Sequence, residues 1–272
     1  TWLKEESLIP LSLTTKVYTG ESMVLKVPVS IINKSYNQRS SVVCGAFAKG
    51  CCGSTMSLKM WFDLWMKRQN PPRIAAYGVL YGGETVIQNT PKYWHIDHGY
   101  FGRSTDPDLY DGHYRITHNN FWHNGFGDHT WDRFNSLKVE LKNWRKSGDH
   151  IVIVPPSKHM ASVLNLQTWL EETIFKIKKH TDRKILVSTK YKNPMSEVIK
   201  NAWCVVTDHS NSAIDAMAQG VPAIFTNPAR KLGSIEDVEN PPMDREFFKN
   251  LAHNQWTLEE IKSGKAWSDL NG

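Results

Sequence analysis

The residues best suited to binding an anion form the segment 208–212, which has the sequence Asp-His-Ser-Asn-Ser. An apolar run that predicts a buried strand precedes it, and a small-residue stretch that predicts a helix follows it. The first turn of a helix has unpaired backbone N–H groups and the positive end of the helix dipole. The side chains of Ser210, Asn211 and Ser212 at that position therefore predict a phosphate or diphosphate site. The alternative is that Ser210 or Ser212 only caps the helix.

Two further strand ends are expected at the same edge of the sheet. Ser157 follows the apolar run 150–154, and Lys190 follows the run 184–188. Ligands of open α/β sheets bind outside the carboxyl ends of the strands, so both side chains are expected near the helix start. Lys190 would supply charge to a diphosphate, and a solvated surface lysine is the alternative. The phosphate-binding loop of NTPases and the dinucleotide-binding fingerprint are both absent from the sequence.

A second group of polar side chains lies in the first half of the chain, where His95, Asp97 and His98 end a predicted strand. Asp97 or His98 would act as a general base on an acceptor hydroxyl. One alternative is that Asp97 holds the following turn, and another is a metal site that includes His95. The sequence has no Cys-x-x-Cys pair and no helical His-x-x-x-His pair, so we predict no metal site.

Two α/β units are expected to position these residues, with a boundary near residue 147 that gives domains 1–147 and 148–272. Strands alternating with helices indicate a mostly parallel sheet in each unit. In the first unit we predict helices over 55–68 and 133–146 and strands over 23–31, 41–48, 73–79, 92–97 and 114–117. In the second we predict helices over 166–180, 195–201 and from residue 210, and strands over 150–154, 184–188, 203–207 and 222–225.

Three local features refine this assignment. Pro28 indicates that the opening strand lies at a sheet edge, because proline cannot donate to a strand ladder. The irregular stretch 102–135 is rich in His, Asn, Gly and aromatic residues, and long loops of this kind are usually functional. Thr257 and Glu260 have the spacing of a capping box, which predicts a helix start.

The composition limits the class of protein. Hydrophobic residues make up 40% and charged residues 22%, as in ordinary globular proteins. The sequence has no apolar run of about 18 residues that would span a membrane and no signal-peptide core at its start, so we expect a cytoplasmic protein. The net charge of +6 and eleven Trp suit an anionic partner such as a nucleotide, a nucleic acid or an anionic glycan.

Five segments together resemble a family of phage and prophage proteins that are similar to GT-B glycosyltransferases. They are residues 93–101, 114–117, 155–157, 207–220 and 255–267. The resemblance begins near residue 44 and continues to the end of the chain. It implies an α/β fold of two Rossmann-like domains facing across a cleft, with a nucleotide-sugar in the second domain and the acceptor facing the first.

The resemblance and the motifs assign a role to each candidate residue. Asp97 and His98 are expected to be catalytic. The donor is expected to contact Ser157, Lys190, His209, Ser210, Asn211, Ser212 and Asp215. The acceptor is expected to contact His95, Tyr100, Arg103 and Arg115. Asp215 stands where many GT-B enzymes have a longer Glu that grips the ribose, and its shorter side chain departs from that pattern.

These assignments predict a glycosyltransferase that moves a sugar from a nucleotide-sugar such as UDP-glucose to a hydroxyl, with no further cofactor. The phage resemblance implies a 5-hydroxymethylpyrimidine in DNA as the acceptor and the host cytoplasm as the location. Such a base must be flipped out or exposed in its groove. The alternatives are a cell-surface glycan as acceptor, a sugar-nucleotide epimerase, and a nucleotide- or nucleic-acid-binding protein without turnover.

Overall fold

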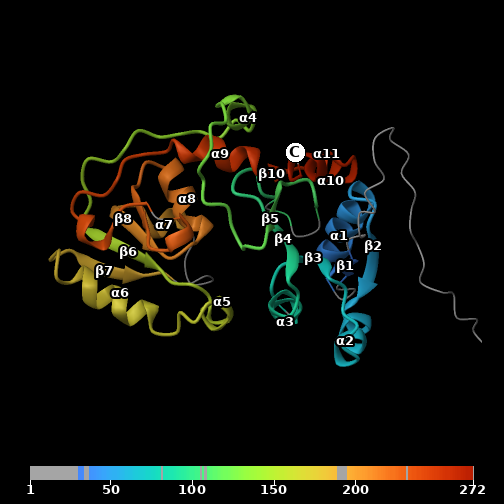
Figure 1. Ribbon diagram of the computed structural model, residues 1–272. Coiled ribbons are helices and arrows are strands. Elements are labelled where there is room, and N and C mark those ends of the chain that lie inside the picture. The colour runs from blue at the N-terminus through green and yellow to red at the C-terminus, as the bar shows by residue number, and fades with distance from the viewer. Residues whose placement is uncertain are drawn as a thin grey trace, which may run out of the picture.

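The computed structural model describes residues 30–33, 37–80, 82–104, 106, 109–188, 195–230 and 232–271. Within these residues the chain forms two β-sheets that lie side by side, each with helices around it (Figure 1). The prediction of a mixed α/β fold with parallel sheets is confirmed. The finer prediction of two GT-B-like domains facing across a cleft stays a prediction.

The first sheet has the strand order β10-β5-β4-β3-β1-β2. Four of its strands run parallel, and β5 and β10 add two antiparallel strands at one edge. The bounds are Ser30–Asn33 (β1), Ser54–Ser57 (β2), Arg73–Tyr77 (β3), Lys92–His98 (β4), Tyr114–His118 (β5) and Gln255–Trp256 (β10). The predicted strands at 73–79, 92–97 and 114–117 are confirmed as β3, β4 and β5.

The second sheet is fully parallel and has the order β7-β6-β8-β9. Its strands are His150–Val154 (β6), Lys184–Val187 (β7), Ala202–Thr207 (β8) and Ala223–Phe225 (β9), which confirms the four strands predicted for this half. Thr207 pairs with Val154 on one side and Phe225 on the other. The segment 208–212 therefore starts from an interior position of the carboxyl edge.

Helices connect most of these strands. Those predicted over 55–68, 166–180 and 195–201 are present as α2, α6 and α7 but are shorter than predicted, and the helix that follows residue 210 is α8. The α-helices are Gln38–Gly50 (α1), Leu58–Met66 (α2), Gly83–Gln88 (α3), Asp132–Ser136 (α4), Lys158–Val163 (α5), Trp169–Ile177 (α6), Met195–Val198 (α7), Asn211–Ala218 (α8), Phe247–His253 (α9), Leu258–Lys262 (α10) and Lys265–Asp269 (α11). Two 3-10 helices cover Pro228–Arg230 and Ile235–Asp237.

The strand predicted over 41–48 is wrong, because this segment belongs to helix α1. The side chain of Asn37 caps the helix by accepting a hydrogen bond from the Ser40 N–H at 3.0 Å. Val43 and Phe47, four residues apart, are both buried on one face of the helix. The β-branched residues favour a strand locally, but the N-cap and the burial of one face stabilise a helix.

The helix predicted over 133–146 is also mostly wrong, because only α4 forms within it. Lys138 has a φ of 53°, a left-handed backbone conformation that interrupts a right-handed helix. Beyond it, the Lys142 N–H donates to the carbonyl oxygen of Ala218 at 2.9 Å. The backbone of this segment therefore bonds to the end of α8 and not within a helix of its own.

The opening strand differs from the prediction in its place. Of the predicted range 23–31 only Ser30 and the following residue fall within β1, and Pro28 lies outside the described residues. β1 pairs with β2 on one side and with β3 on the other, so it is an interior strand of the sheet. The edge position that Pro28 indicated is therefore corrected.

The end of the chain returns to the first sheet. Gln255 pairs with Arg115 in β5, and α10 and α11 pack against α1, as Figure 1 shows. The predicted capping box of Thr257 and Glu260 is confirmed at the start of α10. The predicted second domain, 148–272, thus includes a segment that packs on the first sheet, while the domain division itself stays a prediction.

One hydrophobic cluster joins the loop after β4 to the second sheet. Tyr100 and Phe101, from the loop after β4, are buried in the same cluster as Val205 of β8 and Ala213 of α8. Separate clusters cover the two faces of the first sheet and the other face of the second. The loop after β4 is therefore held against the second sheet by a shared apolar core.

Candidate functional site

The loop after β4 lies against the start of α8, so the two predicted halves of the site meet. The side-chain amide of Asn211 donates to the carbonyl oxygen of Gly99 at 3.4 Å. The guanidinium of Arg103 contacts both carboxylate oxygens of Asp215 at 2.6 Å. Asn211 and Asp215 are predicted donor-side residues and Arg103 a predicted acceptor-side residue. The pairing leaves Asp215 engaged with protein, which does not favour a ribose contact.

The first turn of α8 has the features of an anion site. Ser210 is the N-cap, and its hydroxyl accepts a hydrogen bond from the Ser212 N–H at 3.2 Å. Within the described part of the chain, the Ser212 hydroxyl itself forms no hydrogen bond. Ala213 and Ala216 are fully buried, so this small-residue helix lies close to the sheet. Capping by Ser210 is therefore real, and it leaves the Ser212 hydroxyl for a ligand.

His209, immediately before the N-cap, has a defined set of contacts. Its Nδ1 lies 2.6 Å from Oδ2 of Asp208, and the Asn227 amide donates to the same oxygen at 3.0 Å. The imidazole stacks on the Trp122 ring with 4.4 Å between centroids and 6° between planes. The side chain of Asp208 is 4% exposed and that of His209 is 14% exposed. An almost buried carboxylate therefore orients a partly accessible imidazole.

Asp97, a predicted catalytic base, is engaged by an arginine. Its Oδ2 lies 2.8 Å from Nη2 of Arg115, and its Oδ1 accepts the His98 N–H at 2.8 Å. Burial acts to raise the pKa of Asp97, but the Arg115 guanidinium, with His95 and His98, outweighs it and holds the pKa below its usual value. A carboxylate with a lowered pKa is a weaker base, so this geometry does not favour the role, which stays a prediction.

His98, the other predicted base, is also engaged. Its Nε2 lies 3.1 Å from the Tyr77 hydroxyl and 3.3 Å from Nη1 of Arg39. Because a guanidinium can only donate, Nε2 accepts and the ring hydrogen lies on Nδ1. Burial lowers the pKa of His98 against the opposing effect of Asp97, so the ring is neutral at pH 7. The lone pair of the neutral ring is therefore already used.

Tyr100 is fully buried and positions a loop. The guanidiniums of Arg115 and Arg230 lie 5.3 and 4.9 Å from the centroid of its ring, and its hydroxyl is 3.0 Å from Nδ1 of His123. Arg230 donates to the carbonyl oxygen of His123 at 2.8 Å, and burial lowers the pKa of His123 to about 3. His95 is likewise buried. Neither Tyr100 nor His95 is exposed to contact an acceptor in this conformation.

The remaining predicted donor residues are less informative. Ser157 is exposed and caps α5, where its hydroxyl accepts from the Met160 N–H at 3.2 Å. This is the structural role of an N-cap serine, and it does not test ligand binding. Lys190 lies outside the described residues, and so does the neighbouring Lys192.

Three residues of this site were not assigned a role from the sequence. Trp122 lies in the irregular loop, Asn227 follows β9, and Arg230 ends the 3-10 helix after it. Asn227 and Arg230 follow a parallel strand at the same sheet edge as the segment 208–212. That position is the signal that would have found them. The stacking partner of His209 has no comparable local signal.

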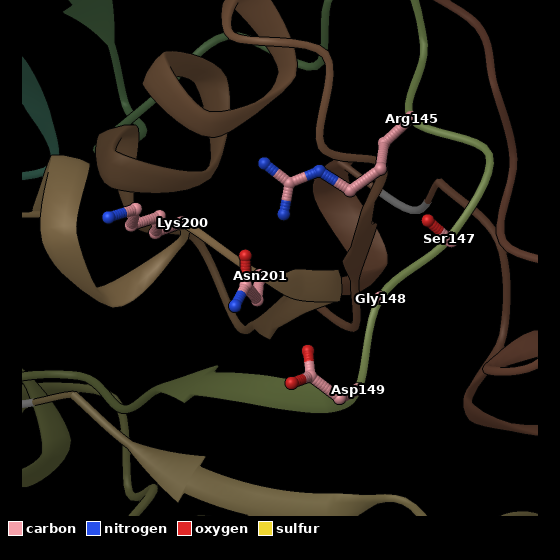
Figure 2. A pocket seen from close by; sticks show the side chains of 6 residues that line it. All are labelled: Arg145, Ser147, Gly148, Asp149, Lys200 and Asn201. Atoms are coloured by element: carbon pink, nitrogen blue, oxygen red, sulfur yellow. The ribbon is translucent and has the colours of Figure 1, made fainter.

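Two hollows can be described, and Arg230 of this edge lines one of them. One, of about 420 Å³, is at the amino ends of β6 and β8, and Figure 2 shows the Arg145 guanidinium extending over it in the direction of Lys200. Another, of about 240 Å³, lies between residues 124–127 and the start of α9. Within the described part of the chain, neither hollow is lined by a predicted donor, acceptor or catalytic residue. The predicted cleft thus stays a prediction.

The described residues contain neither a cluster that could hold a metal ion nor a helix that could cross a membrane. In that part of the chain, no cluster of three or more His, Cys, Asp or Glu side chains is arranged to hold a metal ion. No helix there combines the length and the apolar character that crossing a bilayer needs. The prediction that the site works without a metal stays a prediction.

Comparison with known proteins gives distant similarity only. No model of a protein family matches the sequence, and no curated protein matches it. Among solved structures, the chain is similar to the beta Kdo 2,4 transferase of Thermosulfurimonas dismutans KpsC, with 9% identity, a TM-score of 0.48 and coverage of 83% of this chain and 89% of that one. It is also similar to the beta Kdo 2,7 transferase of the same protein, with 13% identity, a TM-score of 0.46 and coverage of 90% and 100%. A likeness this distant does not define a family for the chain.

Proposed function

We propose that this chain is a glycosyltransferase that moves a sugar from a nucleoside diphosphate donor to a hydroxyl acceptor. The observation that carries the proposal is the contact between Asn211 and Gly99. It joins the anion-binding turn of one sheet to the loop that follows β4 of the other. A reaction between a donor on α8 and an acceptor on the loop after β4 needs this proximity.

The donor diphosphate is proposed to lie against the first turn of α8. The helix dipole stabilises negative charge there, and so does the Ser212 hydroxyl, which has no hydrogen-bond partner among the described residues. That charge grows as the bond between sugar and diphosphate breaks, so the same groups stabilise the leaving group in the transition state. Lys190, outside the described residues, is retained in the proposal as a further cation.

The acceptor is proposed to be a hydroxymethylated pyrimidine in DNA. What supports it is the net charge of +6, together with the resemblance to phage proteins described above. The layout that goes with it is a pair of Rossmann-like units, with the donor on the second sheet and the acceptor on the first. A host cytoplasm is the corresponding location.

Mass spectrometry of DNA tests the proposal. Hydroxymethylated and unmodified DNA are incubated with the protein and a panel of nucleotide-sugars that includes UDP-glucose, and released nucleoside diphosphate is measured in parallel. We expect a hexose mass added only to hydroxymethylated DNA. Donor hydrolysis without any modified DNA would keep the transferase and exclude the DNA acceptor. Binding of nucleotides with neither hydrolysis nor transfer would contradict the enzyme and favour a binding protein.

A further inference from the structure

We infer that His209, oriented by Asp208, is the group that removes the proton from the acceptor hydroxyl. The inference rests on the proposed function, and it moves the base from the end of β4 to the end of β8. It starts from the hydrogen-bonding chemistry of the pair. A carboxylate only accepts hydrogen bonds, so Nδ1 of His209 at 2.6 Å from Asp208 carries the ring hydrogen. The lone pair of the neutral imidazole is therefore on Nε2.

The Nε2 atom is open and the ring is fixed. In the described part of the chain Nε2 forms no hydrogen bond, and the side chain keeps 14% of its area exposed. Asn227 holds the carboxylate of Asp208 at 3.0 Å, and the face of Trp122 lies parallel to the imidazole at 4.4 Å. Stacking on Trp122 fixes the plane of the ring, and a flip within that plane would break the contact between Nδ1 and Asp208, so the lone pair of Nε2 is preorganised for one direction.

The groups at the end of β4 do not have this arrangement. Both oxygens of Asp97 are engaged, by Arg115 and by the His98 N–H. The lone pair of His98 is used by Tyr77 and Arg39. Of these three side chains, His209 is the one whose lone pair has no partner among the described residues. The buried carboxylate of Asp208 lies on the other side of the ring, as in other Asp–His pairs that act as general bases.

In the proposed step the acceptor proton and the electron pair of the broken bond each go to a defined group. The acceptor O–H proton passes to Nε2 of His209 while the acceptor oxygen bonds to the anomeric carbon. The bond between that carbon and the diphosphate oxygen breaks, and its electron pair leaves with the diphosphate. Ser210, the N-cap of α8, directly follows His209 in the chain. The positive end of the helix dipole therefore stabilises the negative charge of the departing diphosphate next to the base. The imidazolium then returns its proton to water.

Replacement of His209 by alanine gives a kinetic test, because it leaves a slot between Trp122 and Asp208 that free imidazole can fill. We expect His209→Ala to lower kcat by a factor on the order of 10²–10⁴, the usual contribution of a positioned base. UDP affinity in calorimetry should change by less than about threefold, or roughly 0.6 kcal/mol. Added imidazole should restore part of the rate. His180→Ala, at an exposed histidine after α6, is the matched control and should keep full activity.

The outcomes separate this inference from the proposed function. If the wild type transfers sugar and His209→Ala has the same kcat, the inference alone is overturned. If Asp97→Asn is then inactive, the role of base returns to Asp97. A His209→Ala variant that loses only UDP affinity would make the histidine a donor contact and not a base. A wild type inactive with every donor and acceptor would remove the proposed function and the inference together.

A second measurement does not depend on turnover. In ¹⁵N-labelled protein, the two-bond couplings of the imidazole distinguish its tautomers, and the His209→Ala spectrum assigns the signal. We expect neutral His209 to carry its hydrogen on Nδ1, and Asp208→Asn to change that tautomer because an amide can donate to Nδ1. A hydrogen on Nε2 in the wild type would overturn the inference, because no lone pair would then face the acceptor.

Discussion

Arg103 and Asp215 are 112 residues apart in the sequence, yet the guanidinium of one contacts both carboxylate oxygens of the other. The pair fastens the loop after β4 to the middle of α8. Each side chain satisfies the other, and both are partly exposed, at 28% and 44%. The pair is thus better suited to holding two segments in register than to contacting a sugar.

Asp215→Asn should therefore leave nucleotide binding unchanged. In a double-mutant cycle with Arg103→Ala, urea unfolding should give a coupling free energy of roughly 0.2–1 kcal/mol, the range for exposed ion pairs. The measurement that decides between the roles is the calorimetric affinity for UDP. An affinity that falls in Asp215→Asn but not in Arg103→Ala would support a contact between Asp215 and the ribose.

The two serines of the α8 turn should respond differently to alanine. Ser212→Ala removes a hydroxyl that has no partner among the described residues, so the free energy of unfolding should stay within about 0.5 kcal/mol of wild type. UDP binding should weaken by about 1–3 kcal/mol, as expected for a lost hydrogen bond to a charged group. Ser210→Ala removes the N-cap and should instead cost about 0.5–2 kcal/mol of stability. Wild-type UDP affinity in Ser212→Ala would place the diphosphate elsewhere.

Glu260 should make the protein lose stability in acid. Burial acts to raise its pKa, but hydrogen bonds from Arg133 and the Thr257 N–H lower it from 4.5 to about 2. Because the pKa is lower in the folded state, the stabilisation is complete above the ordinary value and disappears as pH falls toward 2. Glu260→Gln should lower the free energy of unfolding, measured with urea, by on the order of 1–3 kcal/mol at pH 7. The difference between variant and wild type should shrink as the pH falls toward 2.

Glu259→Gln is the matched control for that prediction. Glu259 is 83% exposed and pairs only with Lys262, at 3.4 Å, among the described residues. Its loss should change the free energy of unfolding by less than about 0.5 kcal/mol at any pH between 3 and 7. Equal effects of the two substitutions would show that the Arg133 contact does not stabilise the end of the chain.

Transfer should persist in the presence of EDTA. The first turn of α8 supplies a dipole and hydrogen-bond donors for the departing diphosphate, and these need no cation to act. The initial rate with UDP-glucose, measured before and after dialysis against EDTA, should agree within about twofold, or roughly 0.4 kcal/mol. Loss of the rate and its return with Mg²⁺ or Mn²⁺ would show that a divalent ion neutralises the diphosphate.

Local patterns in the sequence were sufficient for the four strands of the second sheet and for the N-cap of α8. β6 and β8 are continuous apolar runs followed by polar loops, and they appear where predicted. The cap at Ser210 follows from residue type and position alone. α1 was mistaken for a strand because its β-branched residues resemble one locally, and its helical burial depends on packing against distant segments.

The contacts within the site were harder to predict, because they join distant loops. The sequence assigned His209 to the donor and gave Trp122 no role, and only the fold stacks one on the other. Asp97 satisfied the pattern of a catalytic carboxylate, but the sequence does not show that Arg115 faces it across the β4–β5 pair. Residue type and strand-end position therefore selected side chains that the fold brings close together, while the roles predicted for them depend on pairings between strands and loops and stay predictions.

The return of β10 to the first sheet affects how the protein folds as it is synthesised. β5 gains its outer neighbour only when Gln255 has left the ribosome, long after the strands of the second sheet have emerged. The second sheet is built from contacts within one continuous stretch of chain, so it can form first. Until α10 and α11 have been synthesised, the face of α1 that they cover stays exposed. A chaperone that binds apolar surfaces could bind this face during synthesis.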